Sequence, residues 1–173
     1  MTELDEAWAL ALAEAERRAR ELGRGDIAEY LALRSSNDLL RSIGIEWLIS
    51  TLTLLAGEAN RAGASLSIEK DDAHRFGVGS ATMVGPQITF RSGVRKLTIA
   101  AGWPRTPRDG IVRGNGLACA RIGHLGKRSA NQDLLLVRSS SGAPEWLAVD
   151  ESGTRDALIK DRLRQHLDYL LGE

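Results

Sequence analysis

The stretch QITFRSGVRKLTIAA, residues 87–101, decides the fold of the middle of this chain. Apolar and polar side chains alternate on either side of Ser92-Gly93, and a period of two is typical of β-strands that are buried on one face. A small residue followed by glycine between two such runs favours a tight hairpin turn. The stretch therefore predicts an antiparallel β-hairpin with Ser92 and Gly93 in its turn.

The same period of two continues on both sides of this hairpin. The further runs are SLSIEK (65–70), FGVGSATMV (76–84), LACARIG (117–123), DLLLVR (133–138) and EWLAVD (145–150). Gly85-Pro86 is predicted to turn the chain before the hairpin, and the segment SSSGAP is predicted to turn it before the last run. Six or seven strands with short connections indicate an antiparallel meander.

Both ends of the chain carry the helical period instead. Apolar residues recur every three or four positions from Leu4 to Leu22, and Asp26 can cap a short second helix that ends near Leu33. The polar run SSND predicts the start of a third, long helix over about 38–62. A last helix, capped by Ser152 or Thr154, is predicted to end at Gly172.

This order of elements predicts the α+β class: N-terminal helices including one long helix, then a six- to seven-stranded antiparallel meander, then a C-terminal helix packed on the sheet. The length of 173 residues predicts a single domain over 1–173. Its parts are the helical segment 1–63, the antiparallel sheet 64–150 and the C-terminal helix 152–172.

Composition suggests a cytoplasmic protein that has no contact with a membrane. The net charge is zero, the start of the chain is acidic, and one cysteine cannot form an internal disulfide. The most apolar run, Trp47 to Ala56, lies between Glu46 and Glu58 and is predicted to be too short to span a bilayer. The excess of arginine, 19 residues against 4 lysines, favours a bacterial origin in a GC-rich genome.

Charge is segregated along the chain although its sum is zero. Between residues 91 and 128 the only acid is Asp109. The nine cations there are Arg91, Arg95, Lys96, Arg105, Arg108, Arg113, Arg121, Lys127 and Arg128. Such a block can hold an anionic partner, either an acidic protein or a phosphate-bearing ligand. The competing interpretation is that the acidic helices at the two ends neutralise a basic sheet within one molecule.

The loop GWPRTPRDGIVRGNG, residues 102–116, is the strongest candidate for a binding site. It is longer than an ordinary hairpin connection, and long ordered loops are often functional. Arg105, Arg108 and Arg113 are the candidate anion-binding residues, because guanidinium pairs well with carboxylate and phosphate. Trp103 is a candidate anchor or lid. In the alternative interpretation the loop is a wide turn whose tryptophan closes one end of the core.

Three other patterns indicate chemistry only weakly. Cys119 and His124 could form a catalytic thiolate–imidazole pair, but five residues apart on one strand they face opposite sides. Asp72 and His74 are candidate metal ligands in a segment that also reads as a solvated turn. The GNGLAC and SIEK segments lack the helix that dinucleotide-binding and acyl-enzyme motifs require, so no cofactor is predicted.

These observations favour a non-catalytic binding module that holds an anionic partner on a basic sheet and loop surface. An alternative is a carrier of a small apolar ligand or lipid, with its cavity between sheet and helix, because the strands are rich in small residues. A second alternative is a thiol-dependent enzyme. The long helix is apolar on nearly three sides, and Leu39, Trp47, Leu48 and Leu54 predict a homodimer through the N-terminal helices.

Overall fold

The structure is a computed structural model that describes residues 3–172, apart from the side chain of Leu4. Its helices are α1 (Glu3–Glu21), α2 (Gly25–Arg61) and α3 (Lys160–Leu171), with short 3₁₀ turns at Pro107–Asp109 (η1) and Arg128–Ala130 (η2). Its strands are β1 (Ser67–Val78), β2 (Ala81–Ser92), β3 (Arg95–Gly102), β4 (Ala118–His124), β5 (Gln132–Arg138), β6 (Pro144–Val149) and β7 (Arg155–Ala157). Residues 1 and 2 of the predicted helical segment 1–63 lie outside the described residues, and the whole of the predicted sheet segment 64–150 lies within them.

The seven strands form one sheet in chain order, β1 to β7, and each neighbouring pair is antiparallel. This confirms the α+β class and the antiparallel meander. The hairpin predicted from residues 87–101 is present, but its turn residues are Gly93 and Val94, one position later than expected. Gly93 has a φ of 57°, which glycine adopts without steric cost.

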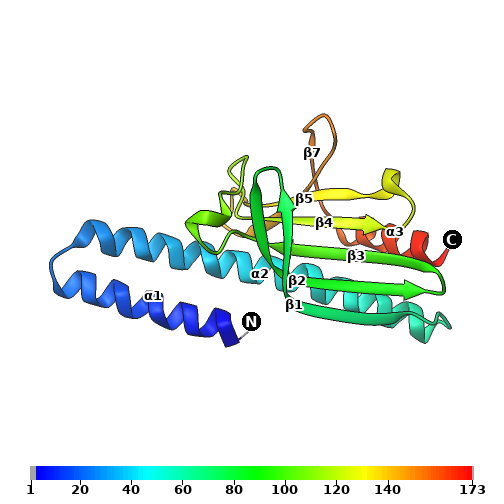
Figure 1. Cartoon of the computed structure of the whole chain (residues 1–173), viewed down its shortest axis with the longest axis horizontal. Coiled ribbons are helices and arrows are strands. Elements are labelled where there is room, and N and C mark those ends of the chain that lie inside the picture. Colours follow the sequence, from blue (N-terminus) through cyan, green and yellow to red (C-terminus); the bar gives the residue numbers. More distant parts are fainter. Residues whose placement is uncertain (1–2, 173) are drawn as a thin grey trace.

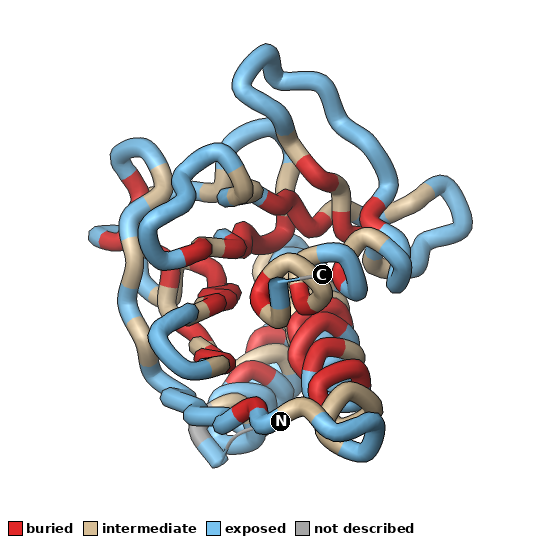
Figure 2. Tube along the Cα trace, turned by 90° about the vertical axis from the view of Figure 1, so that its right-hand side faces the viewer, coloured by how far each residue is buried: buried red, intermediate tan, exposed pale blue. Residues whose placement is uncertain are grey.

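Helices α2 and α3 cover one face of the sheet, and the main core lies between them and the strands (Figures 1 and 2). Leu48 and Leu52 of α2 and Leu163 of α3 are fully buried there against Phe90 and Ile99. Helix α1 packs antiparallel on the first half of α2, and this pair of helices extends beyond the sheet (Figure 1). The apolar contact of the helical layer with the sheet is made by the second half of α2 and by α3, while α1 and the start of α2 reach the sheet side through polar contacts such as that of Asn37 with Arg138.

The opposite face of the sheet is partly covered by the far end of the β1–β2 hairpin. Met83 packs with Cys119 and Leu135 in a second apolar cluster, and Arg121 donates a hydrogen bond to the backbone oxygen of Gly77 over 3.3 Å. The sharp bend that allows this lies at Gly85, where a Cβ would overlap the carbonyl oxygen of Ala101. The predicted turn at Gly85-Pro86 is therefore wrong. The chain bends there within β2, and the hairpin turn lies at Gly79 and Ser80.

The predicted break between a second and a third helix is also wrong, because α2 is one helix of 37 residues. The polar side chains that predicted a cap bond to other elements instead. Asp38 accepts from Trp8 Nε1 at 3.0 Å and from Arg41 at 2.6 Å, while Asn37 accepts from Arg138 of β5. Since these groups do not compete for backbone N–H groups, the helix continues through them.

The C-terminal helix begins later than predicted, at Lys160 instead of near residue 152. The carboxylate of Asp150 accepts hydrogen bonds from the backbone N–H groups of Ser152 and Thr154, which closes a turn in place of capping a helix. The chain then adds β7 to the edge of the sheet. The predicted caps therefore belong to a turn between two strands.

Within residues 3–172, α2 is the one helix that is long and apolar enough to cross a membrane by length and composition alone. The apolar run Trp47–Ala56 was expected to be too short, but it belongs to a helix that continues on both sides. The buried core helix of a globular protein meets the same criterion, and the second half of α2 packs on the sheet.

Candidate functional site

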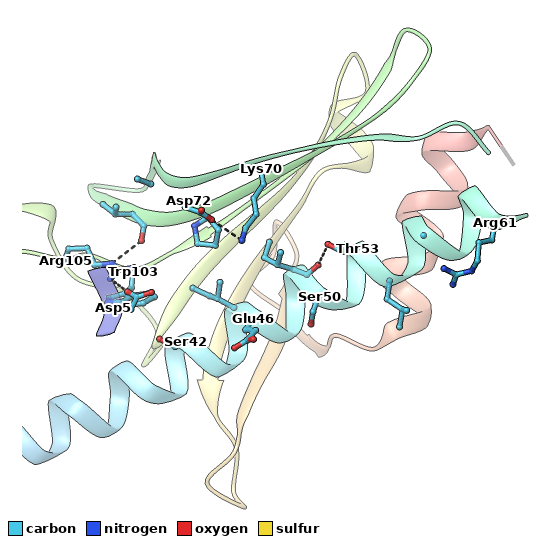
Figure 3. A pocket seen from close by; sticks show the side chains of 17 residues that line it. Asp5, Ser42, Glu46, Ser50, Thr53, Arg61, Lys70, Asp72, Trp103 and Arg105 are labelled. Carbon is cyan, nitrogen blue, oxygen red and sulfur yellow. Dashed lines mark hydrogen bonds and ion pairs between the residues drawn. The ribbon is translucent and has the colours of Figure 1, made fainter. Parts of the chain in front are cut away.

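A groove of about 580 Å³ lies between α2 and the β1–β2 side of the sheet (Figure 3). Helix α2 packs most closely on β3, β5 and β6, and the groove separates it from residues 70–73 of β1 and from Val84 and Pro86 of β2. Seventeen residues line it: Asp5, Ser42, Ile45, Glu46, Ile49, Ser50, Thr53, Leu54, Gly57, Arg61, Lys70, Asp72, Ala73, Val84, Pro86, Trp103 and Arg105.

The inner part of the groove is apolar. Ile45 and Ile49 of α2 form one side and are buried, and Val84 and Pro86 of β2 stand across from them. Ala73 of β1 adds a small side chain to the rim. Sequence reasoning proposed none of these five residues for a site, and its relevant signals were the broad apolar surface of the long helix and the small residues of the strands.

One end of the groove is closed by Trp103, which is 5% exposed. The guanidinium of Arg105 lies 3.5 Å from the centre of the indole ring, and that of Arg41 lies 5.9 Å from it. Arg105 also donates to the carboxylate of Asp5 in α1 at 2.9 Å and to the backbone oxygen of Val84 at 3.3 Å. Trp103, Arg105 and Asp5 gather at this end in Figure 3. The end wall is thus built from four parts of the chain: α1, α2, β2 and the 102–116 loop.

The charges around the groove balance. Three cations (Arg61, Lys70, Arg105) and three carboxylates (Asp5, Glu46, Asp72) line it, so the sum is zero. Lys70 Nζ lies 3.0 Å from Asp72 Oδ1, and Arg105 is paired with Asp5. An apolar interior with a neutral rim suits a ligand that is mainly apolar, because such a ligand loses no hydration of its own charges on binding.

The structure places the three candidate anion-binding arginines in different surroundings. Arg105 is held in the wall of the groove, and Arg113 donates to Ser80 Oγ at 3.4 Å in the β1–β2 turn. Arg108 is exposed and has no hydrogen bond or ion pair to any residue in the described range 3–172. Trp103 is buried in the end wall of the groove and not presented to solvent as a lid.

The loop that carries these arginines is organised by its one acid. Asp109 is buried, and its carboxylate accepts from the backbone and the hydroxyl of Thr106, both at 3.0 Å, and from Arg75 of β1 at 2.7 Å. The hydrogen bonds from Thr106 and the guanidinium of Arg75 hold the pKa of Asp109 below its ordinary value. The loop is thereby fastened to the β1–β2 hairpin.

The other six cations of the basic segment also lie in different surroundings. Arg128 is exposed in η2 and has no ion pair within the described residues. Arg91 lies 3.5 Å from Glu69, and Arg121 lies 2.9 Å from Asp133. Arg95, Lys96 and Lys127 instead line a second cleft, of about 350 Å³, at the end of the sheet next to the last turn of α3. The basic segment therefore gathers unpaired charge at this end and not at the 102–116 loop alone.

Cys119 and His124 lie on opposite faces of the sheet, as their spacing predicts. Cys119 belongs to the outer cluster with Met83, whereas His124 packs against α3. Burial, with a smaller contribution from Asp133, raises the pKa of the Cys119 thiol to about 11. The geometry gives a thiol–imidazole reaction centre no support.

His124 has a different partner, which sequence reasoning missed. Its Nε2 lies 2.9 Å from Nδ1 of His166 in α3, and His166 Nε2 lies 3.2 Å from Gln132 Oε1. Because the amide oxygen can only accept, His166 carries its hydrogen on Nε2 and accepts at Nδ1 from His124. Burial, His124 and Arg162 lower the pKa of His166 to about 4. Burial and Lys127 also lower the pKa of His124, so both rings are neutral near pH 7 and join α3 to the sheet.

The two candidate metal ligands point to different neighbours. Asp72 is paired with Lys70 beside the groove, while His74 accepts a hydrogen bond from Gln87 at 3.0 Å. The segment that holds them is not a hairpin turn but a bulge within β1, between Asp71 and His74. No group of three or more His, Cys, Asp or Glu side chains in the described part of the chain could hold a metal ion.

Comparison with models of protein families, with curated proteins and with solved structures found no match to this chain.

Proposed function

We propose that this protein is a non-catalytic binding module that carries a small apolar or amphipathic ligand, such as a lipid chain, in the groove between α2 and the β1–β2 hairpin. The observation that carries the proposal is an apolar groove of about 580 Å³. This volume lies within the usual range of small-ligand sites, roughly 300–1,000 Å³. A few polar groups at its rim would orient a ligand whose body lies against Ile45 and Ile49.

This function is favoured over the binding of an anionic partner at the 102–116 loop. Arg105 already has a carboxylate partner in Asp5, and an anion that bound Arg105 would have to compete with this part-buried ion pair. Binding of an anionic partner at this loop stays a prediction, and the exposed side chains of Arg108 and Arg113 support it. The thiol-dependent enzyme would need a thiolate at Cys119, which burial opposes.

The proposal is tested first by native mass spectrometry after mild purification. We expect a fraction of the protein to carry an extra mass that disappears after extraction with organic solvent. The stripped protein should then bind a fluorescent fatty-acid analogue in a saturable way, with one site per chain.

The matched variants are Ala73→Trp and Glu29→Trp. Ala73 is exposed at the rim of the groove, so an indole there fills the space that the ligand would occupy. Glu29 is exposed on α2 away from the groove lining and serves as the control. We expect Ala73→Trp to abolish binding of the analogue and Glu29→Trp to leave it unchanged. Equal binding by both variants, or no saturable binding by the stripped parent protein, would refute the proposal.

A further inference from the structure

The second cleft lies where the β3 end of the sheet meets the last turn of α3. It has a volume of about 350 Å³, and its polar lining includes Arg95 and Lys96 of β3, Lys127 from the turn after β4, and Tyr169 of α3. The buried His124 ring also reaches it, stacked edge-on against Tyr169. This cleft is separate from the groove beside α2 and shares no lining residue with it.

The charge of this cleft is unbalanced, unlike that of the groove. Arg95, Lys96 and Lys127 have no ion pair within residues 3–172, and no carboxylate of that range lines the cleft. The ammonium of Lys127 lies 4.1 Å from the centre of the Tyr169 ring, which holds it near the cleft without neutralising it. The backbone carbonyls at the end of α3 offset only part of this charge, because a helix terminus carries roughly half an elementary charge.

Unpaired cations in a concave site strengthen one another's field, since the protein wall keeps water away from one side. Elsewhere in the same basic segment, Arg91, Arg105 and Arg121 each have a carboxylate within 3.5 Å. Arg108, Arg113 and Arg128 also lack a carboxylate partner, but they are exposed and lie outside the cleft lining. The three cations of the cleft are the unpaired ones that the fold brings together around one hollow. Placing them together costs free energy through mutual repulsion, and a bound anion would recover it.

We propose that this cleft binds a small dianion, namely a phosphate group, either free or carried by a small phosphomonoester. Arg95 and Lys127 supply charge-assisted hydrogen bonds from two elements, and Lys96 adds a third positive charge. Tyr169 supplies a flat apolar surface beside the anion. The volume of the cleft admits one such group and not an extended polyanion.

The test is a titration with inorganic phosphate at constant ionic strength, followed by NMR of the histidine ring signals. His124 lines the cleft, and its ring is neutral near pH 7 because burial and Lys127 lower its pKa. A bound dianion next to it favours the imidazolium, so we expect saturable shifts of the His124 signals and a rise of its pKa. A parallel titration with phenyl phosphate compares the affinity for a phosphomonoester with that for free phosphate. The compound that binds more tightly indicates which of the two the cleft accepts.

The variants are Lys127→Gln and Arg95→Gln, with Arg108→Gln as the control. Each of the first two should weaken phosphate binding by about tenfold, the usual effect of losing one charge-assisted hydrogen bond. Arg108 is exposed in the 102–116 loop outside the cleft lining, and its replacement should leave the affinity unchanged. The proposal is overturned if no saturable shift occurs in the parent protein, if all three variants bind equally, or if a duplex DNA competes more strongly than phosphate at equal phosphate concentration.

Discussion

The guanidinium of Arg105 lies 3.5 Å from the centre of the Trp103 ring and at the same time 2.9 Å from the carboxylate of Asp5, which is 100 positions away in the chain. This contact joins α1, the 102–116 loop and the end of the groove. Arg105, a candidate anion-binding residue in the sequence, therefore links these three parts of the fold.

Arg105→Ala is expected to lower the free energy of unfolding by about 1–2 kcal/mol, because it removes a stacked cation and leaves Asp5 without this pairing. Arg108→Ala is the matched control, since Arg108 is exposed on the same loop. Urea denaturation followed by circular dichroism measures both. If the two variants lose the same stability, the structural role assigned to Arg105 is wrong.

Two glycines of α2 are expected to respond to alanine in opposite directions. A Cβ at Gly44 would lie 2.6 Å from a methyl carbon of Leu136 in β5, in a place where Trp146 also donates to the Gly44 carbonyl oxygen at 2.8 Å. Gly44→Ala should therefore destabilise the protein by about 1–3 kcal/mol through overpacking. At Gly57 the nearest atom is the end of the flexible Arg61 side chain, at 3.5 Å. Gly57→Ala should stabilise by about 0.5–1 kcal/mol, the helix propensity difference.

The midpoints of thermal unfolding of Gly44→Ala and Gly57→Ala, compared with that of the parent protein, measure the two changes in stability. The double variant Gly44→Ala, Leu136→Val is a further check, because shortening the Leu136 side chain makes room for the new methyl group. Recovery of part of the lost stability in the double variant is expected. A Gly44→Ala protein as stable as its parent would show that helix and sheet do not approach as closely as described.

The His124–His166 pair makes stability depend on pH. The pKa of His166 is about 4 in the folded protein and 6.5 in its ordinary state, chiefly because burial disfavours the imidazolium, with further lowering by His124 and Arg162. Between these two values the unfolded chain binds more protons than the folded one, so the free energy of unfolding falls as the pH falls from about 6.5 towards 4. The loss is at most about 3 kcal/mol and is absent above about pH 7.

The measurement is the midpoint of thermal unfolding at a series of pH values for the parent protein and for His166→Gln. Carboxylates also titrate near pH 4, so the difference between the two proteins is the readout. The variant should show a smaller loss of stability than the parent between pH 6.5 and 4. Parallel curves would exclude His166 as the group responsible.

Cys119 is expected to react slowly with alkylating reagents. Its pKa of about 11 and its burial against Met83 and Leu135 leave very little thiolate at neutral pH. The rate with iodoacetamide at pH 7.5 should be far below that of a model thiol, and it should rise to the model rate in concentrated urea. A native rate equal to or above that of the model thiol would revive the thiol-dependent enzyme.

The homodimer stays a prediction, and the exposed apolar side chains of α2 support it. Of the four residues expected to need a partner, Leu48 is fully buried, whereas Leu39, Trp47 and Leu54 are 53%, 41% and 51% exposed. With Ile43 they lie on one side of the helix, at spacings of four, four and seven residues. Light scattering at micromolar concentration should give twice the chain mass, and Trp47→Glu should return the mass of one chain. A single-chain mass for the parent protein would reject the dimer.

Much of the fold follows from local patterns. The change from a helical period to a period of two after Gly63 separates the helices from the sheet, because each period places apolar groups on one side of its own element. Short connections then leave little choice other than antiparallel neighbours. The opposite faces of Cys119 and His124 follow from the same period.

The errors share a different cause. Ser35, Asn37 and Asp38 resemble a helix cap, and Gly85-Pro86 resembles a turn, but both segments make their decisive contacts with distant residues. Asp38 bonds to Trp8, and Gly85 lies against the backbone of Ala101 and Gly102. A local pattern indicates which conformations a segment tolerates, and contacts with residues distant in the sequence determine which of them is adopted.

By itself, the sequence determined the order and type of the elements, because hydrophobic periodicity acts over a few neighbouring residues. Only the tertiary structure decided the continuity of α2, the partner of each arginine, the groove beside α2 and the unpaired cations of the second cleft. Those features depend on distances between residues up to 106 positions apart, and such distances exist only once the helices have packed on the sheet.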